Sequence, residues 1–264
     1  MSVLGFALLF VRVLPAELAV TLARCLVILY LLFRRDYRRE ITRNLLILCN
    51  RKDSFFWIRN GWNVGRNLAL MAGIGTRRCD QLIDRAEVRC DNSTRCLLEQ
   101  ELQIAMFSCH FGLWEFLPLV FARAGYTIGV LTGKQGDRTL SQVVPRLRGQ
   151  RNIRLLSHYD DVWRCLRGCT IIGFLVDNTR RGGQSWISVD GLHIRVPQVG
   201  FRLAKQNQMF MVPVWGFLER GRLRVCVGRS GEGTDVVAQL LDQVRRRPQE
   251  WILWGKNGAL ERAA

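Results

Sequence analysis

The residues of this chain best suited to chemistry are a histidine and a glutamate in the stretch His110-Phe111-Gly112-Leu113-Trp114-Glu115. The stretch follows an apolar, strand-like run (104–107) and leads into an apolar, helix-like run (114–124). A side chain at the tip of a strand faces the crevice where open α/β sheets bind ligands. A carboxylate in the first turn of a helix is favoured by the helix macrodipole. If Glu115 reaches the imidazole, it fixes the tautomer and raises the basicity of the other ring nitrogen, so the pattern predicts a general base for a hydroxyl.

Two other interpretations of this stretch deserve weight. A histidine followed at this spacing by a glutamate also arises by chance, and a single histidine at a strand end is more often structural. Cys109 precedes His110 and suggests a Cys–His nucleophile, but adjacent strand residues point to opposite faces, so we expect Cys109 to pack in the core. His158 and His193 fall in an expected loop and an expected hairpin, and we interpret both as structural.

Composition limits the classes of protein that remain. A chain of 264 residues is long enough for one large domain, or one domain with an appendage. Its 39 lysines and arginines exceed its 22 acidic residues, and the formal net charge of +17 favours nucleic acid, an anionic membrane surface, or an acidic protein or phosphate as partner. The 9 cysteines include no Cys-x-x-Cys pair. We therefore predict reduced thiols in a cytosolic domain and no metal or cofactor.

The N-terminal residues 1–33 are mostly apolar, with four interruptions at Arg12, Pro15, Glu17 and Arg24. No secretory signal pattern is evident. The length permits a tilted single span or a helical hairpin lying partly in one leaflet, while a buried core helix is the alternative. The basic cluster at 34–39 follows at once, and the positive-inside rule then places the rest of the chain in the cytoplasm, where its arginines meet anionic headgroups. We therefore divide the chain into a membrane anchor, 1–33, and one globular domain, 34–264.

Strand-like and helix-like segments alternate through the remainder of the chain. We expect strands at 86–90, 104–107, 126–131, 153–156, 170–176, 209–215 and 223–227, and a hairpin over 186–196 that turns at Asp190-Gly191. Apolar residues at three- and four-residue steps predict two helices within 40–70. Further helices are expected between the strands, among them 141–148, 160–167, 200–206 and 234–246. This alternation predicts an α/β fold with a mostly parallel central sheet flanked by helices. Asp177 then lies at the same sheet edge as His110, either as a functional group or as a turn cap.

The order of these segments resembles the late lipid A acyltransferases of bacteria, the lauroyl and myristoyl transferases of the glycerolipid acyltransferase-like superfamily. The resemblance covers nearly the whole chain. Its centre is the histidine-to-glutamate box at 110–115. The other matching segments are Arg39-x-x-x-Arg43-Asn44-Leu45, Pro145-Arg146-Leu147-Arg148, Leu155-Leu156, Asp177-Asn178, Gly191, Pro197, Leu203-Ala204, Val212-Pro213-Val214 and Pro248-Gln249-Glu250-Trp251-x-x-Trp254.

The resemblance implies a function for several residues. Residues 34–264 would form an acyltransferase domain at the inner membrane, facing the cytoplasm. His110 would deprotonate an acceptor hydroxyl, with Glu115 as its partner, and the hydroxyl would attack the thioester of an acyl carrier protein or of coenzyme A. Arg146 matches an arginine of the family's active site, and Asp177, Lys134 and Arg148 are further candidates for substrate binding.

This chain departs from the family at two places, and other functions remain open. Thr132 stands where the family usually has a basic residue, with Lys134 two residues later, and Trp254 is followed by Gly255-Lys256-Asn257 instead of a histidine and an arginine. The acceptor could be a glycolipid, another lipid or a secondary metabolite. A non-catalytic basic protein that binds membranes or nucleic acid is a further alternative, although no zinc spacing or RNA-binding motif supports it.

Overall fold

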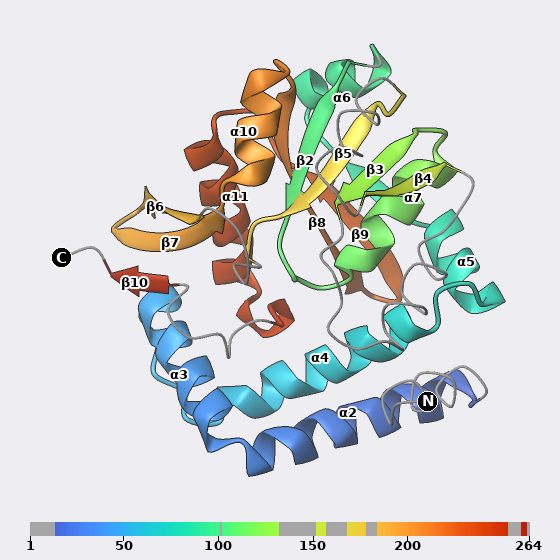
Figure 1. Ribbon diagram of the computed structural model, residues 1–264. Coiled ribbons are helices and arrows are strands. Elements are labelled where there is room, and N and C mark those ends of the chain that lie inside the picture. Colours follow the sequence, from blue (N-terminus) through green and yellow to red (C-terminus); the bar gives the residue numbers. More distant parts are fainter. Residues whose placement is uncertain are drawn as a thin grey trace.

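A mostly parallel sheet forms the centre of the molecule (Figure 1). The computed structural model describes residues 14–100, 102–131, 152–156, 168–177, 184–252 and 260–262. Within them, seven strands pair in the order β1-β9-β8-β2-β5-β3-β4. Their bounds are β1 Glu87–Arg89, β2 Ile104–Ser108, β3 Ile128–Leu131, β4 Ile153–Leu156, β5 Ile171–Leu175, β8 Phe210–Glu219 and β9 Arg222–Val227. Only the pairing of β8 with β9 is antiparallel among these strands, which confirms the predicted fold class.

The two faces of this sheet carry separate hydrophobic cores. In β2, Ala105 and Phe107 pack into one core while Ile104 and Met106 pack into the other, as the alternation of side chains along a strand requires. Helices α10 (Val199–Gln206) and α11 (Gly233–Arg246) cover the first face (Figure 1). Helices α5 (Arg77–Asp84), α6 (Asn92–Glu99) and α7 (Leu117–Arg123) contribute to the second core. A strand buried on both faces reads as a continuous apolar run, as β2 does.

A second, smaller sheet holds the predicted hairpin. Strands β6 (Gln184–Val189) and β7 (Leu192–Pro197) pair antiparallel, and β10 (Leu260–Arg262) adds to the free side of β7. Asp190 and Gly191 both have positive φ, 47° and 70°, which is the backbone of the type I′ turns that join two-residue hairpins. The Asp-Gly signal in the sequence therefore predicted this turn correctly.

The starts of several helices follow from the local sequence. Helix α11 begins with a capping box in which Glu232 and Asp235 satisfy each other's backbone amides, close to the predicted start at 234. The Asp53 carboxylate accepts a hydrogen bond from the Phe55 amide just before helix α4 (Phe56–Ala72). The run after Gly112 begins as a 3₁₀ turn, Trp114–Phe116, and continues as α7. The expected helices 141–148 and 160–167 lie outside the described residues.

Three helices precede the sheet. Their bounds are α2 Ala16–Phe33, α3 Arg35–Cys49 and α4 Phe56–Ala72. The apolar periodicity predicted α3 and α4, and Ile41, Leu45 and Leu48 of α3 are buried. In α4, however, Trp62 and Leu68 lie exposed, because the buried side of that helix is formed in part by glycines and asparagines.

Helix α2 lies along α4 at the base of the molecule (Figure 1). A Cβ atom added to Gly65 would stand 2.5 Å from the Arg24 Cα, and one added to Gly61 would stand 2.9 Å from the side chains of Ile28 and Leu31. This glycine-x-x-x-glycine spacing therefore permits the close approach of the two helices. Helix α2 is long and apolar enough to cross a membrane by length and composition, and 17% of it is buried against the protein.

The contact between α2 and α4 gives a first testable prediction. Replacing Gly65 with alanine places a methyl group against the α2 backbone, so we expect a loss of about 1–3 kcal/mol of unfolding free energy. Helix propensity alone predicts the opposite sign, a gain of about 1 kcal/mol, because alanine is the better helix former. Unfolding of the full chain in detergent micelles measures the difference. A stabilised Gly65→Ala variant would show that the two helices are not packed this closely.

Candidate active site

The register of two neighbouring parallel strands brings His110 and Asp177 together. Strands β2 and β5 pair from Ile104 opposite Ile171 to Ser108 opposite Leu175, and the Val176 amide still donates to the Ser108 carbonyl at 2.8 Å. His110 and Asp177 each follow their strand by two residues, so they leave the sheet side by side at its carboxyl edge. This edge is where open α/β sheets bind ligands.

Asp177 contacts His110 twice. Its Oδ1 lies 2.8 Å from the ring Nδ1 of His110, and its Oδ2 accepts from the His110 backbone amide at 2.9 Å. The Trp251 indole donates to the same Oδ2 at 2.8 Å. The carboxylate is therefore held at three points, and its orientation toward the imidazole is fixed.

The charge of this carboxylate follows from its contacts. Burial by itself would raise the pKa of Asp177, but the charge of His110 and the hydrogen bonds from His110 and Trp251 outweigh burial and lower the pKa below its ordinary value. An ionised Asp177 can only accept at Oδ1, so Nδ1 of His110 carries a proton. In the neutral ring the lone pair then lies on Nε2, which is the arrangement of a general base.

Cys109 does not share this chemistry. Its side chain is buried at 5% exposure in the core covered by α10 and α11. Burial, and then the charge of Asp177, raise the pKa of the Cys109 thiol well above its ordinary value. Because the thiolate is the reactive form, this cysteine is suited to packing, as we expected from the alternation of strand residues.

Glu115 was the expected partner of His110, and the structure places another carboxylate on Nδ1. Glu115 Oε1 accepts a hydrogen bond from the Trp114 indole at 3.1 Å. The Trp114 ring in turn lies 5.0 Å from the His110 ring, measured between centroids. Glu115 is thus near the site, while the carboxylate on Nδ1 belongs to Asp177. The role of Glu115 stays a prediction.

The chain passes directly over β8 as it leaves His110. Gly112 has a φ of +55°, and a Cβ atom there would stand 2.1 Å from the Gly216 carbonyl oxygen. Leu113 donates to that carbonyl at 2.8 Å. Only glycine fits this backbone and this approach, so Gly112 fixes the path by which His110 connects to the Trp114 turn.

The segment 250–252 lies antiparallel to 110–112. The Ile252 amide donates to the His110 carbonyl at 2.9 Å, and the Gly112 amide donates to the Glu250 carbonyl at 2.9 Å. This pairing brings the Trp251 indole to Asp177. In the sequence, Trp251 stands out only as part of the family's final segment, without a role of its own.

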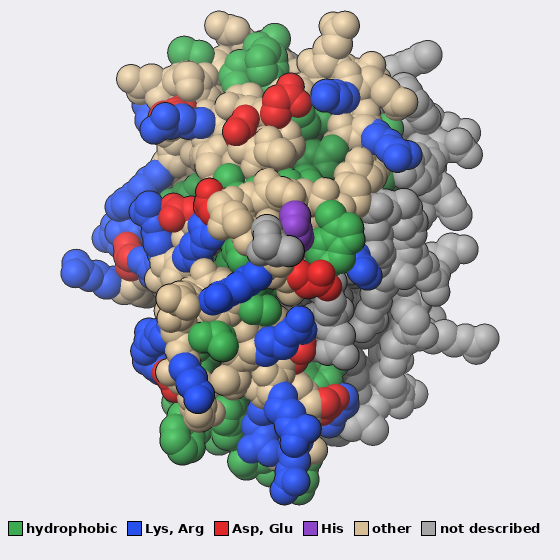
Figure 2. All heavy atoms as spheres, turned by 90° about the vertical axis from the view of Figure 1, so that its left-hand side faces the viewer, with side chains coloured by type: hydrophobic (Ala, Val, Ile, Leu, Met, Phe, Trp, Pro, Cys, Tyr) green, Lys and Arg blue, Asp and Glu red, His purple; other side chains and the backbone are tan. Residues whose placement is uncertain are grey.

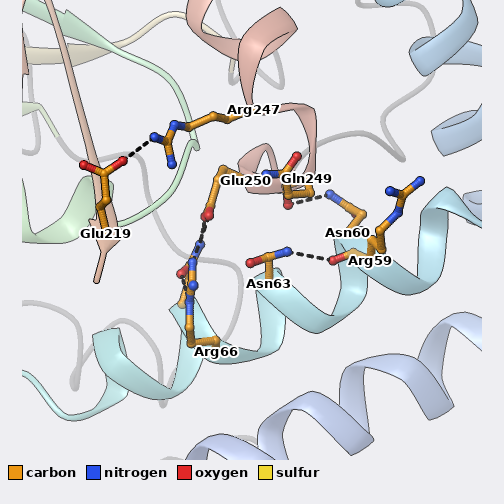
Figure 3. A network of polar contacts seen from close by, with 9 residues as sticks. Arg59, Asn60, Asn63, Arg66, Glu219, Arg247, Gln249 and Glu250 are labelled. Carbon is orange, nitrogen blue, oxygen red and sulfur yellow. Dashed lines mark hydrogen bonds and ion pairs between the residues drawn. The ribbon is translucent and has the colours of Figure 1, made fainter. Parts of the chain in front are cut away.

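Helix α4 anchors that segment through a buried polar network (Figure 3). Asn60 donates to the carbonyls of Gln249 and Trp251, at 3.2 and 3.0 Å. Arg66 and Asn67 bind the two oxygens of Glu250 at 2.8 and 2.7 Å, and Glu250 is only 4% exposed. Sequence reasoning missed this network. Its signal was present in the sequence as Asn60, Asn63 and Asn67, which recur at three- and four-residue spacing.

An apolar cleft begins beside the histidine. Ser108, Trp114 and Glu115 are among its lining residues, and the remaining lining is almost entirely hydrophobic. That lining comes from β2, β3, β5, β8 and α7. The cleft measures about 70 Å³, and its apolar lining suits hydrocarbon better than a polar group.

Several predicted residues cannot be placed. Arg146, Arg148, Lys134, His158 and Trp254 lie outside the described residues. His193 lies on β7, where Ser188 contacts its Nδ1 at 2.8 Å across the hairpin, far along the chain from the candidate site. The cysteines that the structure describes are free thiols.

These observations define the chain as a mainly parallel α/β protein with a carboxylate-paired histidine at the ends of its strands. The family model of the bacterial lipid A biosynthesis acyltransferases matches residues 2–214. The chain therefore belongs to that family, and membership supports an acyltransferase activity with an acyl donor and a glycolipid acceptor. The resemblance seen in the sequence is thereby confirmed. A search of curated proteins found no match.

Proposed function

We propose that this protein is a membrane-associated O-acyltransferase. It transfers a fatty acyl chain from the thioester of an acyl carrier protein, or of coenzyme A, to a hydroxyl of a glycolipid such as a lipid A precursor. The observation that carries this proposal is the 2.8 Å contact between His110 Nδ1 and Asp177 Oδ1 beside an apolar cleft.

His110 acts as the general base. Its Nε2 takes the proton of the acceptor hydroxyl as the oxygen attacks the thioester carbonyl, which gives a tetrahedral intermediate. When the intermediate collapses, the carbon–sulfur bond breaks, the thiolate takes the proton from the imidazolium, and the ester remains. Asp177 stabilises the imidazolium between these steps, as the third member of a catalytic triad does. No acyl-enzyme is needed.

Other residues bind the substrates in this proposal. The cleft lined by Trp114, Leu117 and Phe121 widens to receive the acyl chain. Arg146 binds a phosphate or the oxyanion, with Lys134 and Arg148 as further cationic contacts. Glu115 supports the histidine side of the site through Trp114.

Residues 1–33 attach the protein to the inner membrane, with the domain 34–264 on the cytoplasmic side. Two features support this part of the proposal. Helix α2 exposes apolar side chains, among them Leu26, Leu29 and Leu32, and arginines follow directly after it. The net charge of +17 also favours an acidic carrier protein and an anionic membrane face.

A transfer assay tests the proposed function. The full chain in neutral detergent micelles is incubated with a lipid A precursor and with either acyl carrier protein or coenzyme A thioesters. Mass spectrometry should show one ester-linked acyl chain added to the precursor, with one of the donors preferred. If neither donor yields a product while other hydroxylated lipids are acylated, the acceptor assignment is wrong. If no lipid is acylated, the proposed activity is wrong.

A further inference from the structure

A basic groove lies on α3 and the start of α4, away from the candidate active site. We propose that it binds the phosphate headgroup of an anionic membrane lipid. The inference rests on the proposed membrane attachment and is independent of the proposed chemistry. It assigns a specific lipid contact to residues that the acyl-transfer mechanism does not use.

Among the described residues that line this groove there are five cations and no carboxylate. Its charged lining residues are Arg35, Arg38, Arg39, Arg43 and Lys52. In Figure 2, lysine and arginine side chains gather on the lower part of the face, where Figure 1 places α3, with hydrophobic side chains below them. A concave surface of one charge sign attracts an anion more strongly than scattered charges do.

Most of these cations have no acidic partner in the part of the chain that the structure describes. Arg43 is paired with Glu40 at 3.2 Å, and the neighbouring Arg34 is paired with Asp36 outside the groove. The other four lining cations form no ion pair with described residues. Their charge is therefore available for an external anion.

Arg38 is the best-positioned of the four. Its guanidinium carbon lies 5.3 Å from the ring centroid of Trp57, a residue that is only 7% exposed. Its Nε is buried and has no hydrogen-bond partner among the described residues. A guanidinium held against an aromatic ring has a restricted orientation, which favours a defined contact with a phosphate.

Exposed apolar side chains lie next to the groove residues in the sequence, and they favour a lipid as the source of the anion. Phe33, at the end of α2, is 79% exposed, and Phe55, at the start of α4, is 72% exposed. Leu46 lines the groove itself and is 42% exposed. Large hydrophobic residues beside unpaired cations match the boundary between acyl chains and headgroups better than they match an acidic soluble protein.

Vesicle binding tests this site with a charge-matched control. The groove variant replaces Arg38, Arg39 and Lys52 with glutamine. The control variant replaces Arg85, Arg95 and Arg202, which are exposed on other elements, with glutamine. Each full-length protein is added to phosphatidylcholine vesicles with or without about 20 mol % phosphatidic acid, and the bound fraction is measured by flotation.

Each lysine or arginine near an anionic membrane surface contributes about 1 kcal/mol to binding. We therefore expect the preference for anionic vesicles to fall at least tenfold in the groove variant and by less than threefold in the control. Binding to phosphatidylcholine alone should stay unchanged, because α2 remains apolar. The groove variant should also keep its acyl-transfer rate in neutral micelles, whereas a His110 variant should lose that rate and keep its vesicle preference. The two proposals can therefore fail separately.

Three results would overturn the proposed lipid-binding site. Equal losses in the groove and control variants would mean that net charge alone drives binding. Displacement of the protein from anionic vesicles by inorganic phosphate, at constant ionic strength and at low millimolar concentration, would assign the groove to a soluble phosphate ligand. Loss of a complex with acyl carrier protein in the groove variant, with vesicle preference intact, would make the groove a protein-docking surface.

Discussion

Replacing His110 with alanine should reduce acyl transfer by about 10²–10⁴-fold or more, because the acceptor hydroxyl then loses its general base. The variant should remain folded. The His110 backbone amide and carbonyl keep their bonds to Asp177 and Ile252, and the ring is partly exposed, so its loss leaves no large cavity. The rate is measured with saturating donor and acceptor in micelles, so that the change falls on kcat.

His193→Ala is the matched control for this prediction. That histidine contacts Ser188 within the β6–β7 hairpin and has no part in the proposed chemistry. Its transfer rate should stay within about twofold of the unmodified protein, as expected for a surface change away from the site. Full activity in the His110 variant would reject the base assignment and leave the acyltransferase family unaffected.

The second large effect is expected at Asp177. The Asp177→Asn variant keeps the shape of the side chain but removes the charge that stabilises the imidazolium, and it can favour the wrong histidine tautomer. We expect a fall in kcat of about 10²–10⁴-fold, with the acceptor KM changed much less. Steady-state kinetics separate the two quantities. A change in KM alone would assign Asp177 to substrate binding.

A substitution of Glu115 shows which of the two carboxylates is the partner of His110. If the sequence-based assignment is right, Glu115→Gln should impair kcat about as strongly as Asp177→Asn. If Asp177 is the residue that holds the imidazole, as the contact at Nδ1 indicates, Glu115→Gln should have the smaller effect. The ratio of the two losses therefore decides between the carboxylates.

Stability at low pH gives an independent measure of how much the ionised Asp177 stabilises the folded protein. Its pKa is lower in the folded protein than in the unfolded chain, so the unfolded state binds the proton more readily. The stabilisation from ionised Asp177 is therefore complete above its unfolded pKa of about 4 and is lost as the pH falls through the lower, folded-state pKa. The difference in unfolding free energy between the unmodified protein and Asp177→Asn should be constant above about pH 4 and shrink below it.

Much of the fold follows from local sequence because its signals are local. Apolar runs of strand length separated by helical periods predicted each described strand of the central sheet within a few residues. The Asp190-Gly191 turn was predictable because its positive φ angles suit few other residue pairs. The periodicity of α4 predicted a helix but not its buried side, since Trp62 and Leu68 face outward while Gly61 and Gly65 accept α2.

The sequence by itself determined the family and the mainly parallel α/β class, and it singled out His110 as the candidate base, because each depends on residue types at short spacing. Tertiary structure decided which carboxylate holds the histidine. Glu115 is near His110 in the chain, but Asp177 is beside it in space because β2 and β5 are neighbours in register. The same applies to Trp251 and its support from α4: their positions depend on long-range strand order and helix packing, which local residue patterns do not encode.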